Sequence, residues 1–289
     1  MTMRLLPLAL ASLLALPAAA QTAPQTPAPR APAGHRLLFA PTARAIPAGQ
    51  WRVGVTSLVV PTAGVGLGRG ASLGAGVIAP QIAATGGTVI VEPKWTVLDR
   101  PGLALALGMT AAVTPRAEGT AYGVPYAVAT VGSASAPGRV SATLGLGARV
   151  DVRPTYSGEW TFDAASGEGG YPREGRAARL ANGPAAFAGL EVRATRRISV
   201  LLEAGALPER DRAGERVDWG WCATGLTPDD LSAREPSRAA RYDVTGGAAL
   251  RYATSRVAVD VGAAVIDASD VYGGGEVGPW INVAVGLGR

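Results

Sequence analysis

The stretch VSATLGLGARVDVR, residues 140–153, alternates apolar and polar side chains along its whole length. Successive side chains of a β-strand point to opposite faces, so this segment predicts a strand with one apolar and one polar face. It is much longer than the usual strand of about five or six residues in a globular protein. Its polar face carries small or charged side chains, which suit a crowded or hydrated interior better than a dry core.

The same two-residue period recurs along the chain after residue 50. Turns read from Gly, Pro and polar clusters predict about twelve strands, within a range of about ten to fourteen. The predicted strands are 51–60, 62–69, 71–79, 88–97, 102–114, 119–132, 139–153, 184–195, 197–206, 241–253, 256–266 and 279–289. Tight turns alternate with longer connections from residue 151 onward, which predicts long outer loops over 154–183 and 207–240.

The direction of the apolar face separates two folds. A soluble sandwich would bury it in a core rich in aromatics, but the chain is 48% hydrophobic and only 6% aromatic. Tyr242 and Tyr252 share the apolar face of one predicted strand. Their separation is roughly 34 Å along the strand, or roughly 26 Å after a tilt of about 40°, close to the ~25 Å apolar band of a membrane barrel. We therefore predict an all-β, transmembrane, antiparallel up-and-down barrel over 37–289. A secreted soluble β-sandwich or adhesin-like binding module is the alternative.

The N-terminal region has the features of an exported protein. Residues 1–20 combine a basic start, an apolar run and small residues, which predicts a signal peptide cleaved between Ala20 and Gln21. The Pro/Ala-rich segment 21–36 predicts an extended linker. The segment 37–46 either forms a further strand or lies inside the barrel.

The composition excludes several kinds of chemistry. His35 is the only histidine and lies in the linker, so a His-based catalytic triad or metal site has no residue within the barrel. Cys222 has no partner for an intrachain disulfide. The arginines are scattered among acidic residues, which argues against nucleic acid as a partner despite the net charge of +5. We expect no enzyme activity, no cofactor and no metal site.

Charged side chains on the polar strand faces are the candidate functional residues. By parity they are Glu92, Lys94, Arg149, Asp151, Glu191, Arg193, Glu203, Arg251 and Asp260. They would either line a pore and set its selectivity, or cross-pair into a network that closes the barrel. Barrels of about eight strands are filled by side chains and those of about sixteen hold open channels, so twelve strands predict a narrow lumen. Trp95, Tyr242 and Tyr252 are the predicted aromatic girdle.

Glycines recur at alternate positions from residue 64 to residue 76, except at Ser72. They are Gly64, Gly66, Gly68, Gly70, Gly74 and Gly76. Their spacing does not match a phosphate-binding loop. They predict instead a strand face that is small enough for sharp curvature or for close approach by a plug.

The run Leu38–Arg44 followed by Pro47-Ala48-Gly49, just before the first clear strand, adds to the export signal and the alternating strands. Together they resemble uncharacterised outer-membrane β-barrel proteins of Gram-negative bacteria, over residues 37–289. The resemblance implies a location in the bacterial outer membrane and a non-enzymatic role as a narrow passive channel or as a structural or surface-exposed barrel. It also implies membrane lipid and the outer-membrane assembly machinery as partners, with small solutes or ions as candidate cargo.

Overall fold

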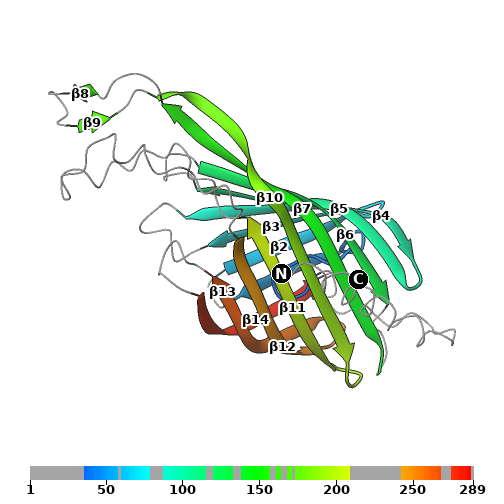
Figure 1. Cartoon of the computed structure of the whole chain (residues 1–289). Helices are drawn as coiled ribbons and strands as arrows, with labels where there is room; N and C mark the ends of the chain where they lie inside the picture. The colour runs from blue at the N-terminus through cyan, green and yellow to red at the C-terminus, as the bar shows by residue number, and fades with distance from the viewer. Residues whose placement is uncertain are drawn as a thin grey trace, which may run out of the picture.

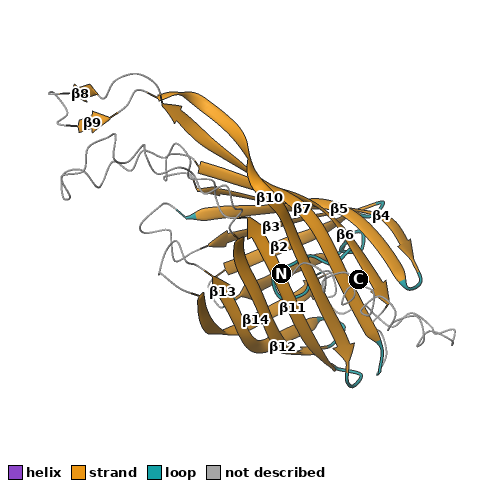
Figure 2. Cartoon of the chain, viewed as in Figure 1, coloured by secondary structure: helices purple, strands orange, loops and turns teal. Residues whose placement is uncertain are grey.

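The computed structural model describes residues 36–57, 60–78, 87–114, 120–132, 138–156, 161–163, 168–170, 173–208, 242–267 and 275–287. Figure 2 shows strands and connecting loops over these ranges. Within this part of the chain, no helix is long and apolar enough to cross a membrane. The predicted signal peptide with Ala20 and Gln21, Cys222, and most of the predicted loop 207–240 lie outside the described residues.

Twelve strands form one closed antiparallel barrel (Figure 1). They are β1 (Trp51–Thr56), β2 (Val60–Gly68), β3 (Ala71–Ile78), β4 (Thr88–Arg100), β5 (Leu103–Thr114), β6 (Thr120–Gly132), β7 (Val140–Tyr156), β10 (Arg173–Arg193), β11 (Ile198–Pro208), β12 (Tyr242–Ala253), β13 (Val257–Asp267) and β14 (Gly275–Leu287). Each strand pairs with its neighbours in the chain, and β1 closes the barrel against β14. The predicted all-β barrel and its strand number are confirmed, and the sandwich alternative is not favoured.

The apolar faces of the strands point outward. Leu146, Leu250 and Val261 are 57%, 59% and 54% exposed. Arg251 and Asp260, on the opposite faces of the same sheet, are each only 1% exposed. Water would strongly disfavour an apolar surface of this extent, whereas lipid accommodates it, and a closed barrel leaves no strand edge unpaired. The two-residue period therefore describes a barrel with an apolar exterior and a polar interior.

The two ends of the barrel differ in the length of their connections. The turns 69–70, 101–102, 194–197 and 254–256 lie at the end where β1 begins and β14 finishes. The two longest connections, 157–172 and 209–241, follow from the strand bounds at the other end. We name these the short-turn end and the long-loop end. This asymmetry is typical of outer-membrane barrels, whose short turns face the periplasm.

One predicted loop is wrong in its bounds. The segment 154–183 was expected to be a loop, but β7 continues to Tyr156 and β10 begins at Arg173, so the two strands extend beyond the rest of the barrel (Figure 1). Pro184, the predicted first residue of the next strand, lies within β10 instead. It follows a register shift after Leu180, and the ladder resumes where Pro184 pairs with Ala148. Along the chain, β7 and β10 are separated by two short strands, β8 (Thr161–Asp163) and β9 (Glu168–Gly170), which pair with each other.

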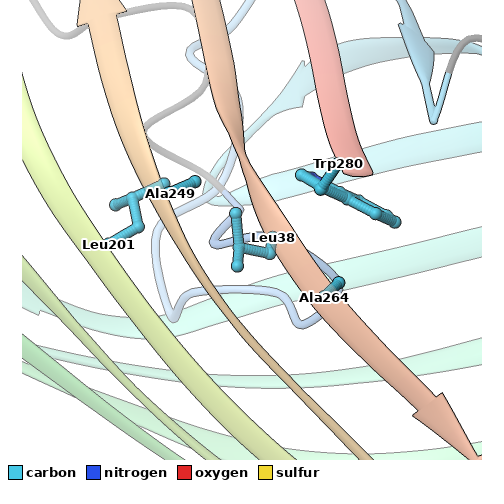
Figure 3. Packing of buried hydrophobic residues seen from close by; sticks show 5 residues of the cluster. All are labelled: Leu38, Leu201, Ala249, Ala264 and Trp280. Carbon is cyan, nitrogen blue, oxygen red and sulfur yellow. The ribbon is translucent and has the colours of Figure 1, made fainter. Parts of the chain in front are cut away.

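Residues 36–50, which we name the inner segment, lie inside the barrel and lead directly into β1. The only bridge outside the named strands in the described residues joins Arg36 to Pro41, so the segment adds no strand to the barrel. Leu38 is 1% exposed and Ala43 is fully buried. Figure 3 shows Leu38 within a cluster that also contains Leu201, Ala249, Ala264 and Trp280. Of the two alternatives for 37–46, the structure therefore selects the interior position.

Candidate functional site

Glu203 binds the inner segment from the β11 side of the lumen. This residue is 7% exposed, and its carboxylate accepts hydrogen bonds from three consecutive backbone N–H groups. The donors are Leu38 at 2.7 Å, Phe39 at 3.1 Å and Ala40 at 2.8 Å. Converging backbone N–H groups form a concave site that favours an anion. One wall carboxylate thus fixes a whole turn of the inner segment.

Strand β4 binds the inner segment from another side, through Lys94 and Thr96. The Lys94 ammonium donates to the carbonyl oxygens of Thr42 at 3.1 Å and Arg44 at 2.7 Å. The Thr96 hydroxyl donates to the carbonyl oxygen of Ala43 at 2.8 Å and accepts from the N–H of Ala45 at 3.0 Å. Side chains of the wall thus bind the backbone groups of residues 42–45, as buried peptide groups require.

Arg251 links the inner segment to a row of paired wall residues. Its guanidinium donates to both carboxylate oxygens of Asp260, at 2.7 and 2.9 Å, and to the carbonyl oxygens of Arg36 and Leu37 at 3.3 Å. The Asn282 amide donates to Asp260 at 3.0 Å. Arg251, Asp260 and Asn282 lie directly opposite one another on β12, β13 and β14. The strand register therefore assembles this cluster.

The two arginines of the inner segment pair with acids of β4. Arg36 forms an ion pair with Glu92 inside the lumen. Arg44 forms one with Asp99 at 3.3 Å, near the short-turn end, and also donates to the carbonyl oxygen of Gly132 at 3.2 Å. The inner segment carries two positive charges, and the wall supplies a carboxylate for each of them.

The inner segment also requires glycine on β2. A Cβ atom at Gly66 would lie far inside van der Waals contact with the carbonyl groups of Ile46 and Pro47. A Cβ atom at Gly64 would lie 2.8 Å from the Ile46 side chain. The glycine spacing predicted close approach by a segment inside the barrel, and these contacts are of that kind.

A second arginine cluster lies toward the long-loop end. Arg149 donates to Asp151 and to the carbonyl oxygen of Pro208, both at 3.2 Å, and is 3.9 Å from Asp243. Its guanidinium also lies 5.1 Å from the centre of the Tyr122 ring. These partners belong to β6, β7, β11 and β12, so Arg149 ties strands of the wall to one another.

The structure places the predicted site residues in different surroundings. Eight of the nine charges have the contacts given above or, for Glu191, approach Arg251 at 3.8 Å. The ninth, Arg193, donates to the carbonyl oxygen of Arg196 at the short-turn end. Sequence reasoning missed Arg52, Thr96, Thr130 and Asn282, which share the inward parity but which we did not select. Of the predicted girdle, Trp95 and Tyr252 are 56% and 43% exposed, and Tyr242 is half-buried.

No protein-family model matches the chain, and no curated protein matches its sequence. Twelve chains of solved structures match its fold. The NanC porin is 12% identical with a TM-score of 0.41, covering 82% of this chain and 97% of its own. The KdgM porin in complex with disordered oligogalacturonate is 10% identical with a TM-score of 0.42, covering 83% and 98%. BamA from Haemophilus ducreyi lacking POTRA domains 1–3 is 10% identical with a TM-score of 0.26, covering 82% and 70%.

The architecture itself defines the class of protein. A closed barrel of twelve strands, an apolar exterior and short turns confined largely to one end are the features of a bacterial outer-membrane β-barrel. Within this class, the particular feature of the chain is a lumen whose charges bind a segment of the same chain.

Proposed function

We propose that this outer-membrane barrel is a narrow, passive and non-enzymatic channel for ions or small solutes, closed at rest by the inner segment. The observation that supports this proposal is the way in which the inner segment is bound to the wall. Glu203, Lys94 and Arg251 hold its backbone through polar side-chain contacts, and among the described residues its backbone-to-backbone hydrogen bonds with the wall join Gly49 and Gln50 to Gly66, where the segment leads into β1. Each of these contacts involves a charged side chain and is worth about 1.5–3 kcal/mol net, and water can replace it when the segment withdraws. Because the strands close into a barrel without the inner segment, its withdrawal would leave the wall intact.

A permanently closed structural or surface-exposed barrel is the second candidate. The observation that favours it is the position of the inner segment, which contacts β4, β11 and β12 and thereby reaches across the lumen. In that case the nine predicted charges would be a stabilising network, and the barrel would conduct nothing. In the channel they would line the conduit once the segment withdraws, and would set its ion selectivity.

Planar-bilayer conductance of the mature barrel tests the two candidates. Glu203→Gln keeps the side-chain shape but weakens three charge-assisted hydrogen bonds. A loss of about 2 kcal/mol would raise the open population about 30-fold. Asp151→Asn is the matched control, because it removes a lumen carboxylate that pairs with Arg149 of the wall and not with a group that holds the inner segment. A silent wild type with a conducting Glu203→Gln variant supports the plugged channel. If the wild type, the Glu203→Gln variant and a barrel lacking residues 37–46 all conduct no current, only the structural role remains.

We propose membrane lipid as the first partner, which the apolar exterior supports, and the bacterial barrel-assembly machinery as the second. We propose that Trp95, Tyr242 and Tyr252 belong to the aromatic girdles at the two membrane interfaces. Unboiled and boiled samples should migrate differently in a mild SDS gel, because a closed barrel resists SDS until it is heated. A protein that stays in solution without detergent would contradict the membrane placement.

The N-terminal segment is proposed to direct export. Removal of residues 1–20 between Ala20 and Gln21 would leave 289 − 20 = 269 residues, with 21–36 as a linker ahead of the inner segment. Intact-mass measurement of protein purified from outer membranes tests this proposal, since a retained Met1 would contradict it.

A further inference from the structure

The five turns at the short-turn end carry only positive charge. The turns are 69–70, 101–102, 133–139, 194–197 and 254–256, and they contain five arginines and no acidic residue, 5 − 0 = +5. The six connections at the long-loop end contain seven arginines and twelve acidic residues, 7 − 12 = −5. The connections at the two ends of the barrel are therefore opposite in charge.

Five exposed arginines form a basic surface at the short-turn end, which we name the arginine rim. They are Arg69, Arg100, Arg196, Arg197 and Arg256. Four of them lie in turns, and Arg100 directly precedes the turn 101–102. Asp99 is the only acidic residue within two positions of these turns in the sequence, and it pairs with Arg44 of the inner segment. The arginine rim therefore presents net positive charge to its surroundings.

Two exposed aromatic side chains indicate the depth of the arginine rim in the membrane. The strand register places Trp95 opposite the first residue of β3 and Tyr252 opposite the first residue of β11, so each ring lies beside a short turn. Trp95 donates its indole N–H to the carbonyl oxygen of Arg69 at 3.2 Å, and the Arg197 guanidinium donates to the Tyr252 hydroxyl at 3.1 Å. Exposed Trp and Tyr rings of membrane barrels gather at the boundary between hydrocarbon and headgroups. Residues in contact with these rings therefore lie at the level of the lipid phosphates.

We propose that the arginine rim binds anionic phospholipid of the periplasm-facing leaflet. A guanidinium is always charged and donates two parallel hydrogen bonds to a phosphate. Its aliphatic stem can lie along apolar surface while the charged group reaches the headgroup. Each basic residue near an anionic membrane surface strengthens binding about fivefold. The net negative charge of the connections at the long-loop end opposes phosphate binding there. The proposal rests on the membrane placement proposed above and needs no channel activity.

Native mass spectrometry of the mature barrel in a neutral detergent tests the arginine rim. Dioleoylphosphatidylglycerol is the anionic lipid, and dioleoylphosphatidylcholine is the zwitterionic control. The wild type should bind the anionic lipid at least about tenfold more tightly, and Arg69→Gln or Arg197→Gln should each weaken this binding about fivefold. The preference should fall as the ammonium acetate concentration rises, because exposed charges are screened. A preference that salt leaves unchanged would contradict the phosphate contact.

Arg179→Gln is the matched control, because it removes one exposed arginine from the part of β10 that lies toward the long-loop end. It should leave the lipid preference unchanged, and a loss equal to that of Arg197→Gln would overturn the assignment to the arginine rim. Equal binding of the two lipids by the wild type would also overturn the proposal and would favour an acidic protein partner. Binding of neither lipid would instead contradict the membrane placement itself.

Discussion

The Arg251 and Arg149 clusters arise from the same sequence pattern but have different partners. Both arginines stand on the polar face of a strand and pair with an aspartate. The Arg251 and Asp260 side chains are each 1% exposed, and Arg251 binds the inner segment. The Arg149 and Asp151 side chains are 11% and 6% exposed, and Arg149 binds other strands. The role of an inward-facing charge therefore depends on the groups that it contacts in the lumen. The position of the residue on the polar face of its strand does not by itself predict that role.

The largest expected effect comes from removing Arg251. Arg251→Ala leaves Asp260 buried without its guanidinium and removes donors from two inner-segment carbonyls, so the free energy of unfolding should fall by about 3–5 kcal/mol. Urea titration in detergent micelles measures it. Arg149→Ala is the comparison, and an equal loss in both variants would show that the two clusters do not differ in kind.

Arg149→Ala should cost less, about 2 kcal/mol, because Arg149 donates a single hydrogen bond to Asp151, at 3.2 Å, and its other carboxylate partner, Asp243, is 25% exposed. In a conducting barrel it should also shift ion selectivity toward cations, since the lumen loses a positive charge while Asp151 and Asp243 remain. Reversal potentials in a salt gradient measure this shift. The frequency of channel opening in Arg149→Ala should match that of the wild type. A raised frequency would mean that Arg149 also holds the inner segment.

Gly66→Ala separates the inner segment from both clusters. The added methyl group would collide with the Ile46 and Pro47 carbonyls and displace the segment, at a cost of about 1–2 kcal/mol and with more frequent opening. Gly123→Ala is the control, because a Cβ there meets only Met109, at an ordinary 3.7 Å. Equal conductance and stability in the two variants would contradict the close approach at Gly66.

The smallest effect is expected at the rim. Asp99→Asn removes the partner of Arg44, but the Asp99 side chain is 39% exposed, so the loss should stay below about 1 kcal/mol. Raising the salt concentration should mask it, because exposed ion pairs are screened. A loss of unfolding free energy as large as that of Arg251→Ala would show that the contribution of a charge to stability does not depend on its depth in the lumen.

Local pattern was enough to predict the wall. The alternation around Leu146 and Arg149 depends only on neighbours in the chain, so strands and their faces follow from it. The pairing of Arg251 with Asp260 also follows once the tight turn 254–256 sets the register. By contrast, Leu38 meets Glu203 across 165 residues, and no local feature indicates that pair. The interior position of 37–46 therefore remained one of two alternatives until the structure decided it.

The sequence separations of these contacts bear on the order of assembly. Arg251 and Asp260 lie nine residues apart on one hairpin, so this pair can form early and bring its own counter-charge into the membrane. The hydrogen bonds from Leu38 to Glu203 and from Arg251 to Arg36 span 165 and 215 residues. Contacts of such separation form slowly, after the intervening strands are in place. The inner segment emerges from the ribosome before every strand of the wall, yet it is the last part of the lumen to find its partners.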